Sequence, residues 1–384
     1  KMTYINGVVR IIAVLFLLKV GYLLFAYFSG NINEINYDSY KYSLSRNDFG
    51  WYSRIATNGY STITQKRDLA GGWYDGRLIQ SEWAFFPVYP SLCRAITNIA
   101  GWSVFESALL LSYIFSITTF VGLFTFCCLY CKNNLQAFYI TILVMVFPFH
   151  YYYSMFYTEA LFFTFMIFSF ICIYKKQYLL LSLFLIPLTL IRPNGIVLVA
   201  PLYFYYLEQT DVFQNWSFDW KKLFSRSTIL NSLYFLAAPI ALGIYCLYQY
   251  SKTGYYFAFA VAQGGWGKTT MMPYNALYQY HDQASNLMDM FNSTYTVIAM
   301  IFALFAWRKL PLSFNILIWL AIILPLTAGS VISMPRYIST LFPLFIILAY
   351  HLYKTKYKFL ILGCLFCLQL YTYYHFFNNS PLGF

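Results

Sequence analysis

Long, mostly apolar segments are the feature that most restricts how this chain can fold. The first of them, VVRIIAVLFLLKVGYLLFAYF at residues 8–28, reaches the roughly 20 residues that a helix needs to cross a bilayer. Charged residues make up only 10% of the 384 residues, whereas soluble domains carry about 25%. The chain is therefore predicted to be an all-α polytopic membrane protein.

Apolar segments of this kind recur along the whole chain. We expect about eleven transmembrane spans, near residues 8–28, 107–130, 135–150, 154–174, 178–191, 195–207, 229–250, 294–307, 312–330, 337–353 and 357–376. No internal repeat divides them, so residues 1–384 are predicted to form a single membrane-embedded domain. No cleavable signal is expected, because no small-residue cleavage site follows the first segment.

The distribution of basic residues predicts how the chain is oriented in the membrane. The formal net charge is +12, and the basic residues concentrate in short connections, as they do in cytoplasmic loops. They are Lys132, Lys175, Lys176, Lys221, Lys222, Arg226, Arg308, Lys309, Lys354, Lys356 and Lys358. Residues 29–106 instead carry as many acidic as basic residues. We therefore expect 29–106 and 251–293 to be outer loops, and we expect no nucleic-acid partner.

Charged or titratable residues stand at the outer ends of four predicted spans. They are His150, Glu159, Arg192 and Arg336, and in this topology they share a side with Asp48 of the first outer loop. Charge near membrane depth is costly and is a default sign of function. Both arginines neighbour a proline close to a predicted helix start, where a guanidinium and the first-turn amides can bind a phosphate.

Each of these residues also has a simpler explanation. An arginine at the interface can extend its side chain to lipid headgroups. Glu159 can orient an arginine or a sugar hydroxyl, or it can only compensate a buried cation. His150 could bind substrate, although a histidine at a helix end is often a satisfied interfacial residue. In the same way, Asn292 and Asn378 begin short glycosylation sequons that occur often by chance.

The segment GGWGKTT at 264–270 invites comparison with a phosphate-binding P-loop. The comparison fails, because the first glycine of that motif would have to stand at Ala262. In the predicted topology the segment is also on the outer side, where no ATP is expected. A sugar- or phosphate-binding loop built on Trp266 and Lys268 is one interpretation, and an ordinary glycine-rich turn is the other.

Several segments together resemble the GPI mannosyltransferase II (PIG-V) family. The first outer loop contributes NDFGWYSRIATNGY and SEWAFFPVYPSLCR, and the spans contribute FPFHYYYSMFYTEALF and LIRPNGIVL. The segment AQGGWGKTTMMPYNAL is similar to a block found in bacterial relatives of that family. The segments follow the family's order and cover much of the chain, although each one alone is a weak signal.

The resemblance implies a GT-C type glycosyltransferase that takes a sugar, mannose in this family, from a polyprenyl-phosphate donor. It implies that Asp48 is the essential acidic residue of the first outer loop, with a catalytic role, and that Asn194 contributes to substrate binding. One position departs from the family pattern, because Asn47 stands where the family has tryptophan before the aspartate. The compact length suggests a bacterial member in the inner membrane, or the endoplasmic reticulum membrane if the protein is eukaryotic.

The implied reaction agrees with the chemistry of these residues. A sugar hydroxyl is a poor nucleophile, and the Asp48 carboxylate could accept its proton as the new bond forms. The leaving lipid phosphate needs cations, which Arg192, Arg336 and Lys268 could supply. With a single carboxylate in this role, we expect direct displacement with inversion. No metal is expected, because the chain has no dense acidic cluster, and no cofactor is expected either.

The aromatic residues of the outer loops have two possible roles. They are Trp51, Trp83, Phe86 and Tyr89, together with Trp266. They could form a platform for the sugar, or they could anchor the loop at the interface, and anchoring is the simpler role for most of them. The expected partners are the lipid-linked donor, a glycolipid or glycan acceptor of unknown identity, and membrane lipids.

Two other functions compete with the enzyme. A transporter or flippase of lipid-linked sugars would have similar spans, but such proteins often show repeats and broken helices at the midplane. In this chain the charged residues are predicted to lie at one face of the membrane and not at its midplane, which favours the enzyme. A structural subunit that has lost activity is the other possibility, and Asp48 argues against it.

Overall fold

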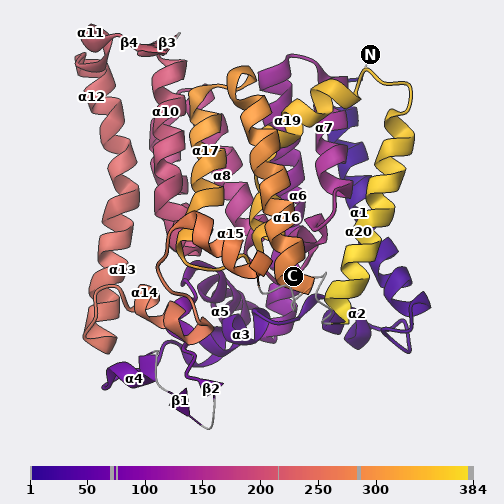
Figure 1. Ribbon diagram of the computed structural model, residues 1–384, viewed down its shortest axis with the longest axis vertical. Coiled ribbons are helices and arrows are strands. Elements are labelled where there is room, and N and C mark those ends of the chain that lie inside the picture. Colours follow the sequence, from indigo (N-terminus) through magenta and orange to yellow (C-terminus); the bar gives the residue numbers. More distant parts are fainter. Residues whose placement is uncertain (1, 70–72, 75–76, 215, 283–286, 379–384) are drawn as a thin grey trace.

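Helices form almost all of the regular structure in residues 2–69, 73–74, 77–214, 216–282 and 287–378, which the computed structural model describes (Figure 1). Five helical runs are long and apolar enough to cross a membrane. They are α1 (Tyr4–Phe28), α6 (Val104–Cys131), α12 with α13 (Arg226–Thr253), α16 with the turn after it (Leu287–Lys309) and α20 (Lys358–Phe377). The prediction of an all-α, multi-pass membrane protein is confirmed for this part of the chain.

Six shorter helices pack among these runs. They are α7 (Asn134–Val146), α8 (Glu159–Tyr174), α9 (Tyr178–Ile191), α10 (Val199–Gln209), α17 (Leu312–Thr327) and α19 (Phe342–Leu352). All six are shorter than the roughly 20 residues of a full transmembrane helix. Their backbone polar groups must therefore be satisfied by other parts of the protein wherever the helix stops.

The remaining elements gather at the two ends of the bundle (Figure 1). One end, here called the loop end, carries α2 (Tyr37–Leu44), α3 (Phe49–Asn58), α4 (Lys66–Leu69), β1 (Trp73–Tyr74), β2 (Arg77–Leu78), η1 (Glu82–Ala84), α5 (Val88–Ala100), α14 (Ala258–Ala262), η5 (Gln263–Trp266) and α15 (Pro273–Asp282). The opposite end carries β3 (Phe213–Gln214), β4 (Ser217–Phe218) and α11 (Trp220–Leu223). The chain begins at this opposite end.

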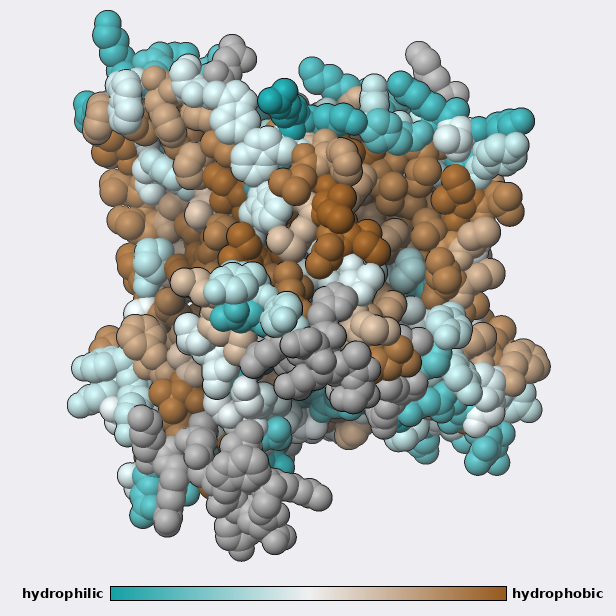
Figure 2. Space-filling view, in the orientation of Figure 1, coloured by the Kyte–Doolittle hydropathy of each residue, from teal (hydrophilic) through white to brown (hydrophobic). Residues whose placement is uncertain are grey.

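A broad apolar belt crosses the middle of the molecule between two polar ends (Figure 2). Large apolar side chains of the outer helices are exposed there, such as Phe16 and Leu17 of α1 and Ile244 and Leu247 of α13. Contiguous apolar surface of this extent is rare on soluble proteins. It is the surface that a lipid-facing helix presents to hydrocarbon chains.

Three irregular segments join the shorter helices near the loop end. The first contains η2 (His150–Ser154), the second is η3 (Pro193–Leu198), and the third contains α18 (Met334–Ile338). The first is tied to the loop region by a hydrogen bond from the Phe156 N–H to the Leu44 carbonyl, at 3.1 Å. Non-helical backbone at membrane depth occurs only where protein buries it or where it lines a cavity. These segments therefore mark the place to look for a site.

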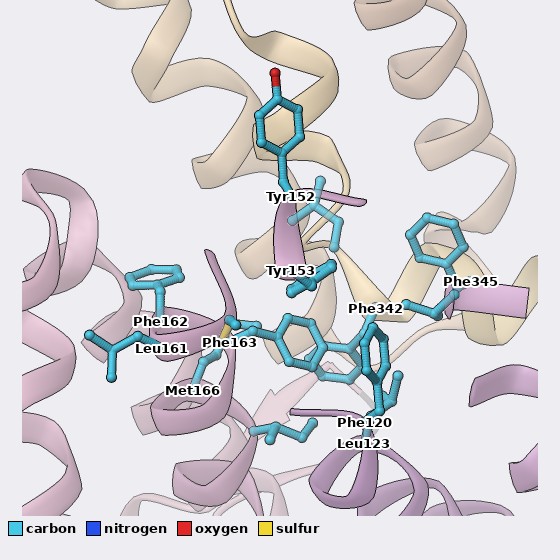
Figure 3. Close-up of a cluster of buried hydrophobic side chains, with 14 of the residues drawn as sticks. Phe120, Leu123, Tyr152, Tyr153, Leu161, Phe162, Phe163, Met166, Phe342 and Phe345 are labelled. Atoms are coloured by element: carbon cyan, nitrogen blue, oxygen red, sulfur yellow. The ribbon is translucent and has the colours of Figure 1, made fainter. Parts of the chain in front are cut away.

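Aromatic packing fills the interior between these segments (Figure 3). Tyr153 and Phe163 contact each other with ring centroids 5.6 Å apart, and both rings point toward Phe120 and Phe342. The neighbouring side chains, Tyr152 and Phe162, point away from this cluster (Figure 3). In each of these two segments, one residue therefore packs in the core and the residue before it contacts a second environment, which contains the charged residues described below.

The helix bounds differ from the expected spans where helical geometry changes. The span expected at 195–207 begins with the 3₁₀ segment η3, and the one expected at 337–353 is divided between α18 and α19. The span expected at 294–307 begins earlier, because α16 is already helical at Leu287. The last residues of the loop expected at 251–293 therefore belong to a helix that is a candidate membrane span, and not to a loop.

Candidate functional site

Four charged side chains from four separate segments form one continuous network. Nη1 of Arg336 lies 3.1 Å from Oδ2 of Asp48. Nε of the same guanidinium lies 2.9 Å from Oε1 of Glu159. That glutamate oxygen also forms an ion pair with Nη2 of Arg192, and Nε of Arg192 donates to the Thr158 hydroxyl at 2.7 Å. The sequence predicts that these residues share one side, and the structure brings them into direct contact.

The local backbone explains why Arg192 and Glu159 meet. Helix α9 ends at Ile191, and Arg192 is extended, with φ −149° and ψ 153°, as residues before proline tend to be. Gly195 then packs on the preceding helix so closely that a Cβ would lie 2.2 Å from the Leu188 carbonyl oxygen. Glycine is required at this contact, so the PNG segment holds Arg192 close to the first turn of α8, where Glu159 stands.

Left-handed residues position the other half of the network. Ser333, with φ +66°, precedes the short helix α18 that carries Arg336. Asn47, with φ +47°, precedes Asp48 at the start of α3. Asparagine enters this region more readily than bulky residues do. The asparagine that departs from the family pattern therefore suits the conformation that presents Asp48 to Arg336.

Burial increases from the loop end inward along the network. The Asp48 side chain is 30% exposed and that of Arg336 14%, while Glu159 is completely buried. A buried carboxylate is tolerated only with strong compensation, and the two guanidinium groups supply it. Glu159 therefore holds both arginines in place, which is one of the two roles that the sequence left open for it. Asp48 is the member of the network that solvent or a substrate can reach.

Aromatic rings enclose the two guanidinium groups. Arg192 lies 5.4 Å from the ring centroid of Phe162, and Arg336 lies 5.6 Å from that of Tyr152 and 5.4 Å from that of Tyr157. Tyr152 and Phe162 are the side chains that point away from the core cluster in Figure 3. Such contacts orient a cation without neutralising it, so the arginines are held by rings as well as by carboxylates.

Lys268 adds a further positive charge. The charges of Lys268, Arg336 and Arg192 all act on the Tyr337 hydroxyl, which places the lysine beside the network. Among the residues that the structure describes, no carboxylate forms an ion pair with Lys268. Two carboxylates and two guanidinium groups balance each other, so the lysine leaves the site with one excess positive charge.

The loop that carries Trp266 packs against the first large loop. The Trp266 ring lies 5.6 Å from the ring centroid of Trp51 and 5.6 Å from that of Phe85. Gly265 makes this approach possible, because a Cβ there would lie 2.4 Å from the Ile79 carbonyl oxygen. Trp51 stands one helical turn after Asp48. The GGWGKTT segment is therefore part of the same site, as a packed loop that carries one tryptophan and one lysine.

Asn194 lies near Arg192. It lines a narrow cavity of about 20 Å³ with Arg192 and Tyr337. The other walls of this cavity come from α8, η3 and α17, through Phe162, Met166, Leu198, Leu317, Leu320, Ala321 and Leu324, and from Thr340 between α18 and α19. A cavity of this size holds about one water molecule, so it is a small gap beside Arg192.

Two residues predicted to bind substrate lie in packed surroundings. Trp83 is completely buried, donates its indole N–H to the Ser61 carbonyl at 3.2 Å, and stacks on Tyr60. This position anchors the loop and leaves no face for a sugar. His150 is 2% exposed and hydrogen-bonds the Val144 carbonyl. Its ring contacts are with Phe147, Tyr153 and Phe345, not with the charged network.

Sequence reasoning missed three polar residues of the site. Thr158 accepts a hydrogen bond from Arg192, and Tyr337 lies among three cations. Tyr52 is buried in α3, and this burial, together with the nearby Asp48 carboxylate, raises the pKa of its hydroxyl, which stays protonated. Thr158 and Tyr337 each stand one position from a predicted residue, and Tyr52 stands four positions from Asp48. The available signal was therefore closeness in the sequence to a predicted residue.

Comparison with known proteins adds no assignment. No family model matches the chain, and no curated protein is significantly similar to it.

Proposed function

We propose that this protein is a membrane-embedded glycosyltransferase of the GT-C type. It would move a sugar, mannose by the resemblance of its motifs, from a polyprenyl-phosphate donor to a lipid- or glycan-linked acceptor. The observation that carries this proposal is the partly exposed Asp48 carboxylate at the end of a buried Arg336–Glu159–Arg192 chain. Displacement of a lipid phosphate requires a base that the acceptor can reach and cations that stabilise the leaving group. Asp48 would be this base, and the two arginines would be among these cations.

The proposed topology places this site on the non-cytoplasmic face. Counting the six shorter helices as crossings gives eleven spans, with residues 29–106 and 251–293 outside. The concentration of basic residues in the connections at the opposite end supports this orientation. In a bacterium the membrane would be the inner membrane, and in a eukaryote the endoplasmic reticulum membrane.

In the proposed reaction an acceptor hydroxyl attacks the anomeric carbon of the donor sugar. The hydroxyl oxygen forms the new bond to carbon while its proton passes to Asp48. The bond between the anomeric carbon and the phosphate oxygen breaks, and its electron pair leaves with the lipid phosphate. The configuration at the anomeric carbon inverts, because attack and departure occur on opposite faces of the sugar.

The cations act on the leaving group. The donor phosphodiester carries one negative charge, and the departing lipid phosphate gains a second. Interactions that grow as this charge develops accelerate the reaction. Lys268 is suited to this role, because it adds a charge that Asp48 and Glu159 do not balance. In the proposal Arg192 and Arg336 bind the donor phosphate, because Glu159 holds both guanidinium groups in fixed positions.

The test is a transfer assay with purified protein. Wild-type protein is incubated with a panel of polyprenyl-phosphate sugars and with membrane glycolipid extracts as acceptors. We expect transfer from one donor, release of the polyprenyl phosphate, and loss of both in Asp48→Asn. If no donor of the panel is consumed, or if Asp48→Asn consumes it at the wild-type rate, the proposed function is wrong.

A further inference from the structure

A second cavity lies at the opposite end of the bundle from the loop end, away from the charged network (Figure 1). It has a volume of about 390 Å³ and is lined by residues at the ends of α6 and α10, by residues that follow α10, and by the turn before α17. Pockets that hold small ligands have volumes of roughly 300–1,000 Å³. This cavity is therefore large enough to hold a small organic molecule.

Glu208 supplies the charge of this cavity. It is the one charged side chain among the described residues that line it, and it is partly exposed. Its Oε1 accepts a hydrogen bond from the Ser313 N–H at 3.1 Å, and its Oε2 accepts one from the Ser313 hydroxyl at 2.5 Å. Each carboxylate oxygen can accept about two hydrogen bonds. One position on each oxygen therefore remains for a ligand.

The negative charge of Glu208 is not balanced by a neighbouring cation. No basic side chain of the described chain forms an ion pair with it, and Lys222 instead donates to the Asp211 carbonyl at 3.4 Å. Helices α6 and α10 end at the cavity and α17 begins there. A helix carries about half a negative charge at its C-terminus and about half a positive charge at its N-terminus. The cavity therefore favours a cation.

Two exposed aromatic rings line the same cavity as the carboxylate. The Tyr130 side chain is 36% exposed and that of Trp216 is 61% exposed. Tyr130 packs against Phe314 with ring centroids 5.6 Å apart, and Trp216 stacks on Trp307 with centroids 6.2 Å apart. The charge of Glu208 acts on the Tyr130 hydroxyl, which places the carboxylate beside this ring. Aromatic faces attract cations, and groups of such rings recognise organic ammonium ions.

These features together select the class of ligand. The carboxylate disfavours a phosphate or any other anion. A single calcium or magnesium ion needs several oxygen ligands at about 2.0–2.6 Å, whereas this cavity offers one carboxylate. A neutral sugar would leave the charge of Glu208 unbalanced. An ammonium group attached to carbon balances that charge, donates to the free positions of the carboxylate and contacts the ring faces.

We propose that the cavity at Glu208 binds an organic ammonium group, with the Tyr130 and Trp216 rings beside it. Two sources carry this chemistry at a membrane surface, namely the headgroup of an ethanolamine or choline phospholipid and a free, water-soluble amine. The proposal does not depend on sugar transfer, because the cavity shares no residue with the charged network.

Binding is tested first with wild-type protein in a maltoside detergent, by ligand titrations followed with saturation-transfer NMR. The probes are choline, ethanolamine, glycerophosphocholine and glycerophosphoethanolamine, and 3,3-dimethylbutan-1-ol serves as the neutral isostere of choline. We expect at least one ammonium probe to bind, and the neutral isostere to bind at least about tenfold more weakly than choline. Tighter binding of a glycerophosphodiester than of its free amine identifies a lipid headgroup. The reverse order identifies a soluble amine.

Two variants with matched controls test the residues. Glu208→Gln and Trp216→Ala should each lower the affinity for the ammonium probe about tenfold, because each removes one attraction to the cation. Asp219→Asn removes one negative charge at the same end of the bundle, and Trp220→Ala removes a ring that is 63% exposed. Neither control residue lines the cavity, so both controls should bind like wild type.

Three results would overturn the proposal. They are no binding of any ammonium probe, equal affinity for choline and its neutral isostere, and affinities of Glu208→Gln and Trp216→Ala that match the two controls. Tighter binding of methyl α-glucoside than of any ammonium probe would also overturn it, since the cavity would then be a sugar site. If Glu208→Gln fails to fold in thermal unfolding, the wild-type comparison and the exposed Trp216→Ala still decide. None of these measurements involves sugar transfer, so the proposed function and this proposal can fail separately.

Discussion

Asp48 and Arg336 are 288 positions apart in the chain, yet their side chains lie 3.1 Å from each other. The contact joins the first residues of α3 to the short helix α18. Arg336 also contacts the buried Glu159. The contact with Arg336 therefore joins Asp48, at the loop end, to the buried part of the charged network. The pair is thus the point where an accessible carboxylate meets the buried arginines.

Replacing Asp48 by asparagine should abolish sugar transfer while the protein still folds and binds donor. Asparagine keeps the shape of the side chain but cannot accept the acceptor's proton, and a general base contributes about 10²–10⁴-fold to the rate. Initial rates of transfer and donor affinity measure the two effects. Asp38→Asn is the control, since that carboxylate is exposed and forms an ion pair with Lys41 of its own helix. Wild-type turnover in Asp48→Asn would remove Asp48 from the mechanism.

Replacing Arg336 by lysine should impair both donor binding and turnover. Lysine keeps the charge, but its single ammonium cannot contact Asp48 and Glu159 in the way that the planar guanidinium does. Alanine should be worse, because the charge is lost as well. Arg192→Lys should behave similarly, since Arg192 contacts Glu159 and Thr158 together.

The matched control for these arginine variants is Arg226→Lys. Arg226 is exposed at the first residue of α12, far along the chain from the network. If Arg192→Lys and Arg336→Lys are as silent as this control in both measurements, the arginines do not bind the donor, and Lys268 becomes the leading candidate.

Replacing Glu159 by glutamine should destabilise the protein strongly. The glutamate is completely buried between two guanidinium groups, and removing one member of a buried ion pair costs about 3–5 kcal/mol. Thermal unfolding in detergent measures the effect. In a double-mutant cycle with Arg192→Leu, the two losses should be far from additive, because the second substitution removes a charge that the first left uncompensated. Additive losses would show that the two residues do not interact.

The sequence predicts the side of the membrane for the network but not its pairing. Asp48, Glu159, Arg192 and Arg336 each stand next to an apolar segment, so span ends and loop charges are enough to place them together. Their contacts depend on where the shorter helices stop and on irregular turns between them. Hydropathy does not contain that information, because a 3₁₀ segment such as η3 is as apolar as the helix that follows it.

The same limit applies to individual residues. Trp83 and His150 are predicted to bind substrate because they lie within the matching motifs. Hydropathy does not show that both side chains are buried, with hydrogen bonds to the Ser61 and Val144 carbonyls. The polar residues at the start of α16 were missed because the span was expected to begin at 294. Asp289 and Asn292 then fell in an expected loop, where polar residues need no explanation, although within a candidate membrane span they do.

Cysteine labelling should confirm that the loop end is outside. In a background without native cysteines, Thr62→Cys in the first large loop should react with a membrane-impermeant maleimide in intact cells. Lys221→Cys in α11 should react only after permeabilisation. Both positions are exposed, so a difference reports sidedness and not burial. Labelling of Lys221→Cys from outside, with Thr62→Cys protected, would overturn the topology and the proposed reaction site with it.

The native thiol of Cys93 should be inert in the folded protein and should make folding pH-dependent in alkali. Burial in α5 raises the pKa of Cys93 to about 12, from an ordinary value of 9.0. The neutral thiol is therefore favoured in the folded state, and its contribution to stability is complete below pH 9. Between pH 9 and pH 12 the unfolded chain loses this proton while the folded protein keeps it, so stability falls with rising pH. Thermal unfolding across this range should show a smaller decrease for Cys93→Ala than for wild type. Equal decreases, or rapid labelling of Cys93 in the native protein at neutral pH, would show that the thiol is accessible and that α5 is not packed as the structure indicates.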